Sequence, residues 1–157
     1  MIPLHEPRFD DTDIAALADS LRSSWVSTGG PAIDLFENEM AAYVGTRFGV
    51  AVANGTVGLQ LMIETLRRQM GIKEEFEVLV PTLTFAATAN AVVHANGVPV
   101  FLDSGVLSMN IDPGSIFKIL ETCYRFDYST KVWRSRNNGR ILLAILVAHE
   151  TERKATP

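Results

Sequence analysis

The chain has 157 residues, a formal net charge of -4 and a hydrophobic share of 47%. This length is typical of a single domain, and the apolar share is ordinary for a globular protein with a core. The acidic balance gives no basis for nucleic acid or an anionic membrane as partner. Cys123 is the single cysteine, which excludes an internal disulfide and fits a reducing compartment.

Three further signals are absent. The charged amino terminus has no apolar segment of the signal-peptide kind. The longest purely apolar run, residues 141–148, is too short to span a bilayer. His5, His94 and His149 have no spacing that would bring two of them onto one helix face as metal ligands. We therefore expect a cytoplasmic protein with no membrane span and no metal site.

Two helices are predicted near the amino terminus. Residues 11–23 carry apolar side chains at helical spacing, and a loop rich in Ser, Thr and Gly follows at residues 25–30. Pro31 suits the first turn of a second helix, and Gly45 suits its carboxyl-terminal cap.

Residues 48–103 alternate between apolar runs of strand length and helical patterns. Strands are predicted at residues 48–53, 78–81 and 98–102, and amphipathic or Ala-rich helices lie between them. Such alternation is typical of a mainly parallel sheet with right-handed crossovers. We expect an α/β fold with three layers, α/β/α.

The turn at Asn54, Gly55 and Thr56 is a candidate phosphate site. Gly55 lets the backbone approach a ligand closely, and the first amides of the next helix favour an anion. The alternative is an ordinary strand-to-helix turn with Thr56 as cap. Ligands of parallel sheets lie beyond the carboxyl ends of the strands, where residues 82–85 and Asp103 are also expected. Asp103 has an alternative role as the cap of the next turn.

The remainder of the chain predicts one more helix and up to three strands. Asp112 and Pro113 begin a helix, and a polar, aromatic and basic segment covers residues 124–140. Asn138-Gly139 is a hairpin signal, so residues 131–143 are expected to form two short strands. The basic residues of this segment are interpreted as a solvated face. Residues 141–147 are predicted to be a buried parallel strand.

Two segments carry a family resemblance. NGTVGLQL (residues 54–61) and VPTLTFAATANAVVHANGVPVFLD (residues 80–103) resemble the nucleotide-sugar aminotransferases of the DegT/DnrJ/EryC1/StrS type, which depend on pyridoxal phosphate (PLP). IPLHEPRFD, SSWVSTGGPAIDLFENEMAAYVGT and the NIDP turn at residues 110–113 match as well. The likeness is closest to the branch that aminates UDP-linked 4-keto-6-deoxy-N-acetyl sugars on routes to bacillosamine and legionaminic acid. It covers roughly residues 2–145.

The resemblance implies the amino-terminal part of the large domain of fold type I. The chain would then be a single partial domain, residues 1–157, with residues 146–157 an aberrant tail. Partners would be a nucleotide sugar and an amino-acid donor, and the family is homodimeric. The implied cofactor is PLP, with its phosphate held at Asn54, Gly55 and Thr56 and its ring stacked on Phe85. The implied substrate contacts are Trp25, Ser27 and Thr28; the alternative for Trp25 is a tryptophan that packs under its loop.

The resemblance also implies that part of the active site is missing. PLP chemistry needs a Schiff-base lysine and a carboxylate at the pyridine nitrogen, and in the family both lie beyond the matched segment. No catalytic residue is therefore expected among the lysines present, which are Lys73, Lys118, Lys131 and Lys154.

Three interpretations stay open. We expect a truncated sugar aminotransferase that is inactive alone, in amino-sugar and surface-polysaccharide biosynthesis. The first alternative is a non-catalytic α/β module that binds a phosphorylated ligand. The second is an unrelated parallel-sheet domain of the flavodoxin or response-regulator kind, although the sequence lacks the acidic cluster that a phosphoacceptor site needs.

Overall fold

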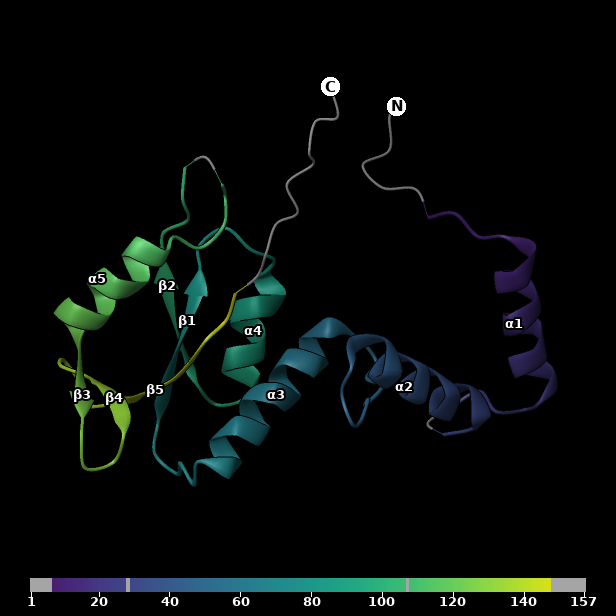
Figure 1. Cartoon of the computed structure of the whole chain (residues 1–157), viewed down its shortest axis with the longest axis horizontal. Coiled ribbons are helices and arrows are strands. Elements are labelled where there is room, and N and C mark those ends of the chain that lie inside the picture. The colour runs from purple at the N-terminus through teal and green to yellow at the C-terminus, as the bar shows by residue number, and fades with distance from the viewer. Residues whose placement is uncertain (1–6, 28, 107, 148–157) are drawn as a thin grey trace. The chain divides into compact units, whose positions relative to one another are not determined.

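A computed structural model describes residues 7–27, 29–106 and 108–147 (Figure 1). The chain divides into two compact units, Met1–Ala51 and Val52–Pro157. The ten helices and strands follow in chain order as two helices in the first unit and a mixed α/β arrangement in the second.

The first unit contains the two predicted helices. Helix α1 (Asp11–Arg22) begins with a capping box, in which the Asp10 carboxylate accepts hydrogen bonds from the backbone amides of Thr12 and Asp13. Helix α2 (Pro31–Val44) has Pro31 in its first turn and ends at Gly45, whose φ of +70° is left-handed. Ala41 is the one buried side chain among the described residues of these two helices. Most of their apolar side chains are therefore exposed to solvent.

The second unit is built on a five-stranded sheet in the order β2-β1-β5-β4-β3. Strand β1 pairs in parallel with β2 and with β5, whereas β4 is antiparallel to both β5 and β3. The strands are β1 (Phe76–Pro81), β2 (Val98–Leu102), β3 (Tyr124–Asp127), β4 (Val132–Ser135) and β5 (Ile141–Ile145). The helices are α3 (Gly55–Gln69), α4 (Ala86–His94) and α5 (Pro113–Cys123).

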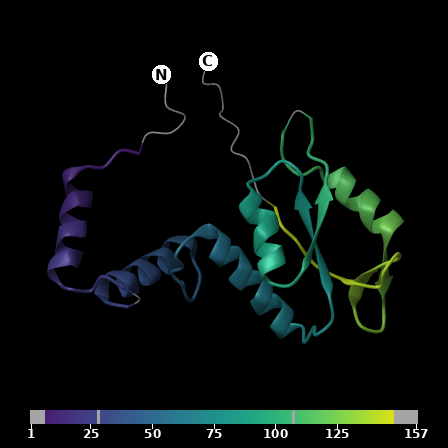
Figure 2. The same ribbon diagram turned by 180° about the vertical axis from the view of Figure 1, so that it is seen from behind.

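The sheet has helices on both faces, which confirms the three-layer expectation (Figures 1 and 2). Side chains alternate along β1, so Phe76, Val78 and Val80 form one core with α3 and α4. Leu79 lies in a second core with Leu102 and the apolar face of α5. Every residue of β1 is buried, as a central strand covered on both faces requires.

The predicted strand at residues 48–53 is wrong, because the structure shows no strand there. Phe48 and Val50 are instead exposed, at 73% and 70%. The segment has the apolar composition of a strand, but a strand also needs a neighbour for its backbone hydrogen bonds. The strands expected at residues 78–81, 98–102 and 141–147 are confirmed as β1, β2 and β5, although β5 ends at Ile145.

The polar segment after α5 folds as a hairpin. Strands β3 and β4 pair along their full length, from Tyr124 opposite Ser135 to Asp127 opposite Val132. Strand β4 and the start of β5 are the two short strands expected around the Asn138-Gly139 turn, whereas β3 was not predicted. The Asp127 carboxylate accepts bonds from Ser129 and Thr130 in the β3–β4 turn.

A buried carboxylate joins this hairpin to the parallel part of the sheet. Glu77 on β1 is 4% exposed. Its Oε2 accepts a hydrogen bond from the Tyr124 hydroxyl at 2.6 Å, and its Oε1 accepts one from Asn138 Nδ2 at 2.8 Å. Burial, and then the hydrogen bond to Glu77, raise the pKa of Tyr124 well above its usual value. Tyr124 therefore remains a hydrogen-bond donor across the neutral range.

The basic residues of the hairpin region are not simply a solvated face. Arg134 Nη2 lies 3.1 Å from Glu74 Oε1, and Arg140 Nη2 lies 2.6 Å from Glu75 Oε2. These pairs link β4 and the β4–β5 turn to the chain that enters β1. Their glutamates are largely exposed, so each pair adds little to stability.

Candidate functional site

The candidate phosphate site lies at the start of α3. Asn54 caps the helix, since its Oδ1 accepts a hydrogen bond from the amide of Val57 at 3.1 Å. The alternative that named Thr56 as the cap is therefore wrong in that detail. The amides of Gly55 and Thr56 donate to no protein acceptor within the described ranges. A Cβ placed on Gly55 would have no heavy atom within 4 Å. The helix start is therefore open to an anion from solvent.

Phe85 lies at the start of α4, where it occupies the N-cap position. Its side chain is 81% exposed, so a face of the ring is free to stack on a planar group. The neighbouring Thr84 hydroxyl bonds to that of Thr88 at 2.8 Å, which fixes the first turn of α4. Thr82 donates to the Leu102 carbonyl at 2.8 Å, so β1 and β2 end together at one edge of the sheet, as expected.

The structure does not join the two halves of this candidate site. Among the described residues, no hydrogen bond or ring contact links Phe85 to residues 54–56. The amino-terminal half of α3 instead meets the carboxyl-terminal end of α4, where Gln60 Nε2 lies 3.4 Å from the His94 carbonyl. The assignment of Asn54, Gly55, Thr56 and Phe85 to one ligand stays a prediction.

The candidate substrate loop lies in the first unit. Trp25 is 59% exposed, and its side chain packs on Gly30, where an added Cβ would come within 2.9 Å of it. A cavity of about 300 Å³ lies beside it, lined by Ser27, Gly29, Gly30, Pro31 and residues of α1. Thr28 lies outside the described residues.

The described lysines lie on elements away from the α3 and α4 starts. Lys73 precedes β1, Lys131 lies in the β3–β4 turn, and Lys118 lies on α5, on the opposite face of the sheet from α4. Lys118 and Asp103 together line a cavity of about 260 Å³. The cavities lined by Lys73 and Lys118 do not include Phe85. Lys154 lies outside the described residues.

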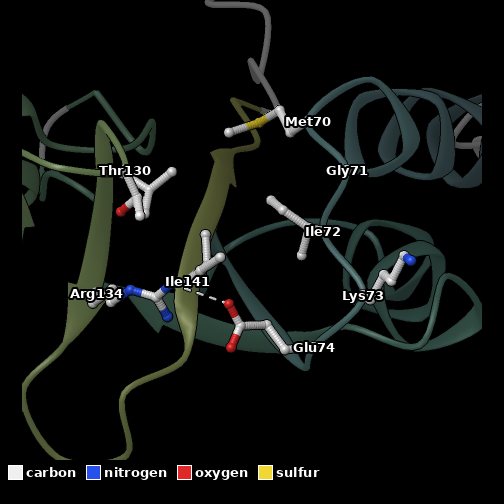
Figure 3. Close-up of a pocket in the computed structure, with 9 residues that line it drawn as sticks. Met70, Gly71, Ile72, Lys73, Glu74, Thr130, Arg134 and Ile141 are labelled. Atoms are coloured by element: carbon white, nitrogen blue, oxygen red, sulfur yellow. Dashed lines mark hydrogen bonds and ion pairs between the residues drawn. The ribbon is translucent and has the colours of Figure 1, made fainter.

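A larger cleft lies at the opposite edge of the sheet (Figure 3). Its volume is about 380 Å³, and it separates the α3–β1 connection from β4. Ile72 and Ile141 point into it, and the pair of Arg134 and Glu74 closes one side. It contains none of the residues predicted for the site.

Sequence reasoning missed the polar group at the centre of the second unit. Glu77 stands inside the apolar run FEVLVP, and a carboxylate in a buried strand is a signal in itself, because it requires partners. Those partners, Tyr124 and Asn138, lie 47 and 61 residues further along the chain, so the sequence pattern could not name them.

The described residues contain neither a membrane-spanning helix nor a cluster of metal ligands. None of the helices there combines the length and apolar character needed to cross a membrane. No group of three or more His, Cys, Asp or Glu side chains in these ranges is arranged to hold a metal ion.

Comparison with known proteins identifies a family. The pattern of the DegT/DnrJ/EryC1/StrS aminotransferase family matches residues 7–123. The match includes the starts of α3 and α4 and ends at the last residue of α5, so the β3–β4 hairpin lies outside it.

Individual relatives are similar over most of this chain. A GDP-perosamine synthase of Vibrio cholerae is 40% identical over 103 residues, which is 66% of this chain and 27% of that protein. The spore coat polysaccharide biosynthesis protein SpsC of Bacillus subtilis is 37% identical over 112 residues, 71% of this chain and 28% of its own length. The chain thus spans about three tenths of the length of the curated relatives it matches.

A solved structure supports the fold. The Escherichia coli GDP-4-keto-6-deoxy-D-mannose-3-dehydratase with bound hydrated PLP superposes with a TM-score of 0.64 and 25% identity, over 76% of this chain and 30% of that one. Structural neighbours are therefore PLP-dependent sugar-modifying enzymes of fold type I.

Proposed function

Because the chain belongs to the DegT/DnrJ/EryC1/StrS aminotransferase family, we propose that it forms the cofactor-anchoring part of a PLP-dependent aminotransferase of nucleotide-linked 4-keto sugars. The proposed process is amino-sugar and surface-polysaccharide biosynthesis, which agrees with the names of the relatives. We place the chain in the amino-terminal part of the large domain of such an enzyme. We further propose that the enzyme is a cytoplasmic homodimer.

The observation that carries this proposal is the open start of α3. Two unpaired amides, at Gly55 and Thr56, stand at the positive end of a 15-residue helix, and a phosphate carries the charge and the acceptors that they need. The absence of any atom near the Gly55 Cβ position allows the phosphate oxygens to approach the backbone. The residues present therefore fit the phosphate end of the cofactor.

The chain contributes binding and orientation to the chemistry. PLP, when bound, acts as an electron sink for the carbon that gains or loses the amino group. Asn54 fixes the first turn of α3, the amides of Gly55 and Thr56 hold the phosphate, and Phe85 supplies an exposed ring for stacking on a planar group. We propose that the lysine and the ring-nitrogen carboxylate belong to the part of the relatives that this chain does not cover.

The substrate side of the proposal rests on the loop before α2. Trp25 and Ser27 border a cavity of about 300 Å³. An exposed indole packed on a glycine is suited to stacking against a nucleobase or sugar. We propose Trp25, Ser27 and Thr28 as substrate contacts on this basis and on the family resemblance.

A non-catalytic phosphate-binding module is the second candidate. It is favoured by one observation: the α3 start is complete within this chain, whereas the cavities lined by Lys73 and Lys118 do not include Phe85. Such a module would need only the helix amides and would not depend on the aromatic ring.

Binding of pyridoxamine 5′-phosphate, measured by isothermal titration calorimetry, tests the proposal. This probe carries the phosphate and the ring but no aldehyde, so it forms no adducts with surface lysines. We propose that the Thr56 hydroxyl, beside its amide, also donates to the phosphate. Thr56→Val and Phe85→Ala should therefore each weaken binding by about five-fold to tenfold, since a hydrogen bond or a stacking contact contributes about 1 kcal/mol. Pyridoxamine, without the phosphate, should bind much more weakly.

Two matched variants control for general effects. Thr65→Val changes an exposed threonine in the middle of the same helix, and Phe117→Ala removes a phenylalanine that is 68% exposed on α5; neither should alter binding. Equal affinity for inorganic phosphate and for pyridoxamine 5′-phosphate, with Phe85→Ala unchanged, would favour the phosphate module. Equal affinity for pyridoxamine with and without phosphate would contradict both candidates.

A further inference from the structure

The start of α4 departs from the usual chemistry of helix capping. Phe85 occupies the N-cap position with φ of -61° and ψ of 144°, and its side chain makes no capping hydrogen bond. Ser, Thr, Asp and Asn are preferred at this position because their side chains accept a hydrogen bond from the first turn, which a phenyl ring cannot do. Departures from such local rules are expected at functional sites. The first turn of α4 is therefore held by residues other than Phe85.

Thr88 supplies the bonds that Phe85 lacks. Its amide donates to the Phe85 carbonyl at 3.0 Å, and its hydroxyl bonds to that of Thr84 at 2.8 Å. A helical threonine often directs its hydroxyl to the carbonyl of the preceding turn, as Thr122 does with the Lys118 carbonyl on α5. Thr88 instead bonds to the side chain that precedes Phe85, so the backbone is tied together on both sides of the ring residue.

Thr88 also links this exposed turn to the fixed part of α4. Thr88 is 5% exposed, and Ala91 and Val92 further along the helix lie in the core with α3 and β1. Thr88 is the first buried residue of α4, whereas Phe85 and Ala86 before it are exposed. The hydroxyl bond thus connects a buried anchor to the turn that carries the ring.

The Phe85 ring takes its position from the backbone. Among the described residues, no aromatic or cationic side chain contacts this ring, and the ring is largely exposed. By contrast, the Phe126 ring is in contact with Tyr128 and Trp133. The location of the Phe85 ring before a ligand arrives therefore depends on its Cα and Cβ, which follow the backbone that the threonine pair holds.

We propose that Thr88 is a positioning residue, which through its hydroxyl bond to Thr84 holds the Phe85 ring in place for stacking on a bound ligand. This inference rests on the proposed function, because the planar group in question is the pyridine ring of PLP. A ring that is placed before binding loses less conformational freedom when the ligand arrives, so binding is tighter. Thr88 is buried and its hydroxyl is already bonded, so it acts through Phe85 and not by contact with the ligand.

Isothermal titration calorimetry of the whole chain with two probes tests this role. Pyridoxamine 5′-phosphate carries both the ring and the phosphate, whereas inorganic phosphate carries the phosphate alone. Thr88→Val keeps the shape of the side chain and removes the hydroxyl. We expect it to weaken binding of pyridoxamine 5′-phosphate by about threefold to tenfold and to leave binding of inorganic phosphate within about twofold. A general loss of folded protein would weaken both probes alike.

Three further variants separate the hydroxyl bond from packing. Thr88→Ser keeps the hydroxyl and should retain the affinity of the parent chain. Thr84→Val removes the same bond from its half-buried end, so it should repeat the effect of Thr88→Val, and it serves as the test if the buried substitution prevents folding. Thr122→Val is the control, because it removes an exposed helical hydroxyl on α5 and should change the affinity for neither probe.

A double-mutant cycle shows whether Thr88 acts through the ring. In a Phe85→Ala background, Thr88→Val should cause no further loss of affinity for pyridoxamine 5′-phosphate, because the ring that it positions is absent. An equal loss in both backgrounds, equal losses for the two probes, or a Thr88→Ser variant as weak as Thr88→Val would overturn the positioning role.

The result for the parent chain distinguishes this inference from the proposed function. If the parent chain binds pyridoxamine 5′-phosphate and Phe85→Ala weakens that binding, the proposed function stands. Unchanged affinity in Thr88→Val and Thr84→Val then overturns the positioning role alone. A parent chain that does not bind the probe, or a Phe85→Ala variant that binds it as the parent does, overturns the role of the ring and the inference together.

Discussion

Removal of one hydroxyl group tests the role of the buried carboxylate. Tyr124→Phe keeps the ring, so it creates no cavity, but it deprives Glu77 Oε2 of the donor that lies 2.6 Å away. Glu77 is 4% exposed, so water cannot readily replace the lost bond. A hydrogen bond to a charged group contributes about 1.5 to 3 kcal/mol. Because Asn138 still donates to Oε1, we expect a loss of about 2 kcal/mol in the free energy of unfolding.

Urea unfolding followed by tryptophan fluorescence measures this loss. The chain has two tryptophans, Trp25 and Trp133, and a Trp25→Phe background leaves Trp133, which contacts Phe126 at a ring-centroid distance of 5.4 Å. The signal then reports on the hairpin itself. Tyr128→Phe is the control, because Tyr128 is 78% exposed on the same hairpin, and its effect should stay within about 0.5 kcal/mol.

A double-mutant cycle decides whether the pair is responsible. Glu77→Gln removes the charge, and we expect a coupling energy with Tyr124→Phe of about 1 kcal/mol or more. Additive effects of the two substitutions, or a Tyr124→Phe variant as stable as the parent, would refute the argument that Glu77 holds the hairpin through Tyr124.

Two further predictions concern local packing and helix capping. A Cβ on Gly97 would lie 2.5 Å from Phe76 Cε2 in the core, so Gly97→Ala should lower the free energy of unfolding by about 1 to 3 kcal/mol. A Cβ on Gly58, inside α3, would lie 3.4 Å from its nearest neighbouring atom, so Gly58→Ala should raise the free energy of unfolding by up to about 1 kcal/mol. Thermal unfolding measures both, and equal effects would contradict the packing argument. Hydrogen bonds from the Ser115 hydroxyl, and then from the Ser115 and Gly114 amides, lower the pKa of Asp112 from 3.8. The stabilising effect of the ionised Asp112 is therefore present above about pH 3.8 and is lost as the pH falls through the lower pKa that Asp112 has in the folded state. Asp112→Asn should flatten this part of an acid titration followed by circular dichroism. A titration curve unchanged by the substitution would contradict this role of Asp112.

The sequence pattern predicted those elements whose apolar composition follows directly from their burial. The apolar runs of β1, β2 and β5 could be recognised because a parallel strand covered on both faces has few polar residues. Residues 48–53 have the same composition, but whether they form a strand depends on a free sheet edge beside them, which composition does not encode. Strand β3, with the sequence YRFD, carries two charged residues, and its pairing depends on a turn held by the Asp127 carboxylate.

The candidate site was predictable only in its local parts. The Asn54-Gly55-Thr56 turn and the position of Phe85 at a helix start follow from spacing and turn chemistry, and the structure confirms both positions. Their approach to each other depends on how α3 lies on α4, which involves contacts such as Gln60 with His94. These contacts join residues 34 apart, and helix periodicity contains no information about them.

The anchor at Glu77 also has an evolutionary consequence. The β3–β4 hairpin lies outside the segment that matches the family pattern, yet its attachment depends on a residue 47 positions earlier, in a strand that the pattern includes. A lineage that lost the hairpin and kept Glu77 would retain an unpartnered carboxylate in a buried strand, at a large cost in stability. A lineage that kept the hairpin and replaced Glu77 would lose its attachment. The hairpin and this one strand position are therefore expected to be inherited, gained or lost together.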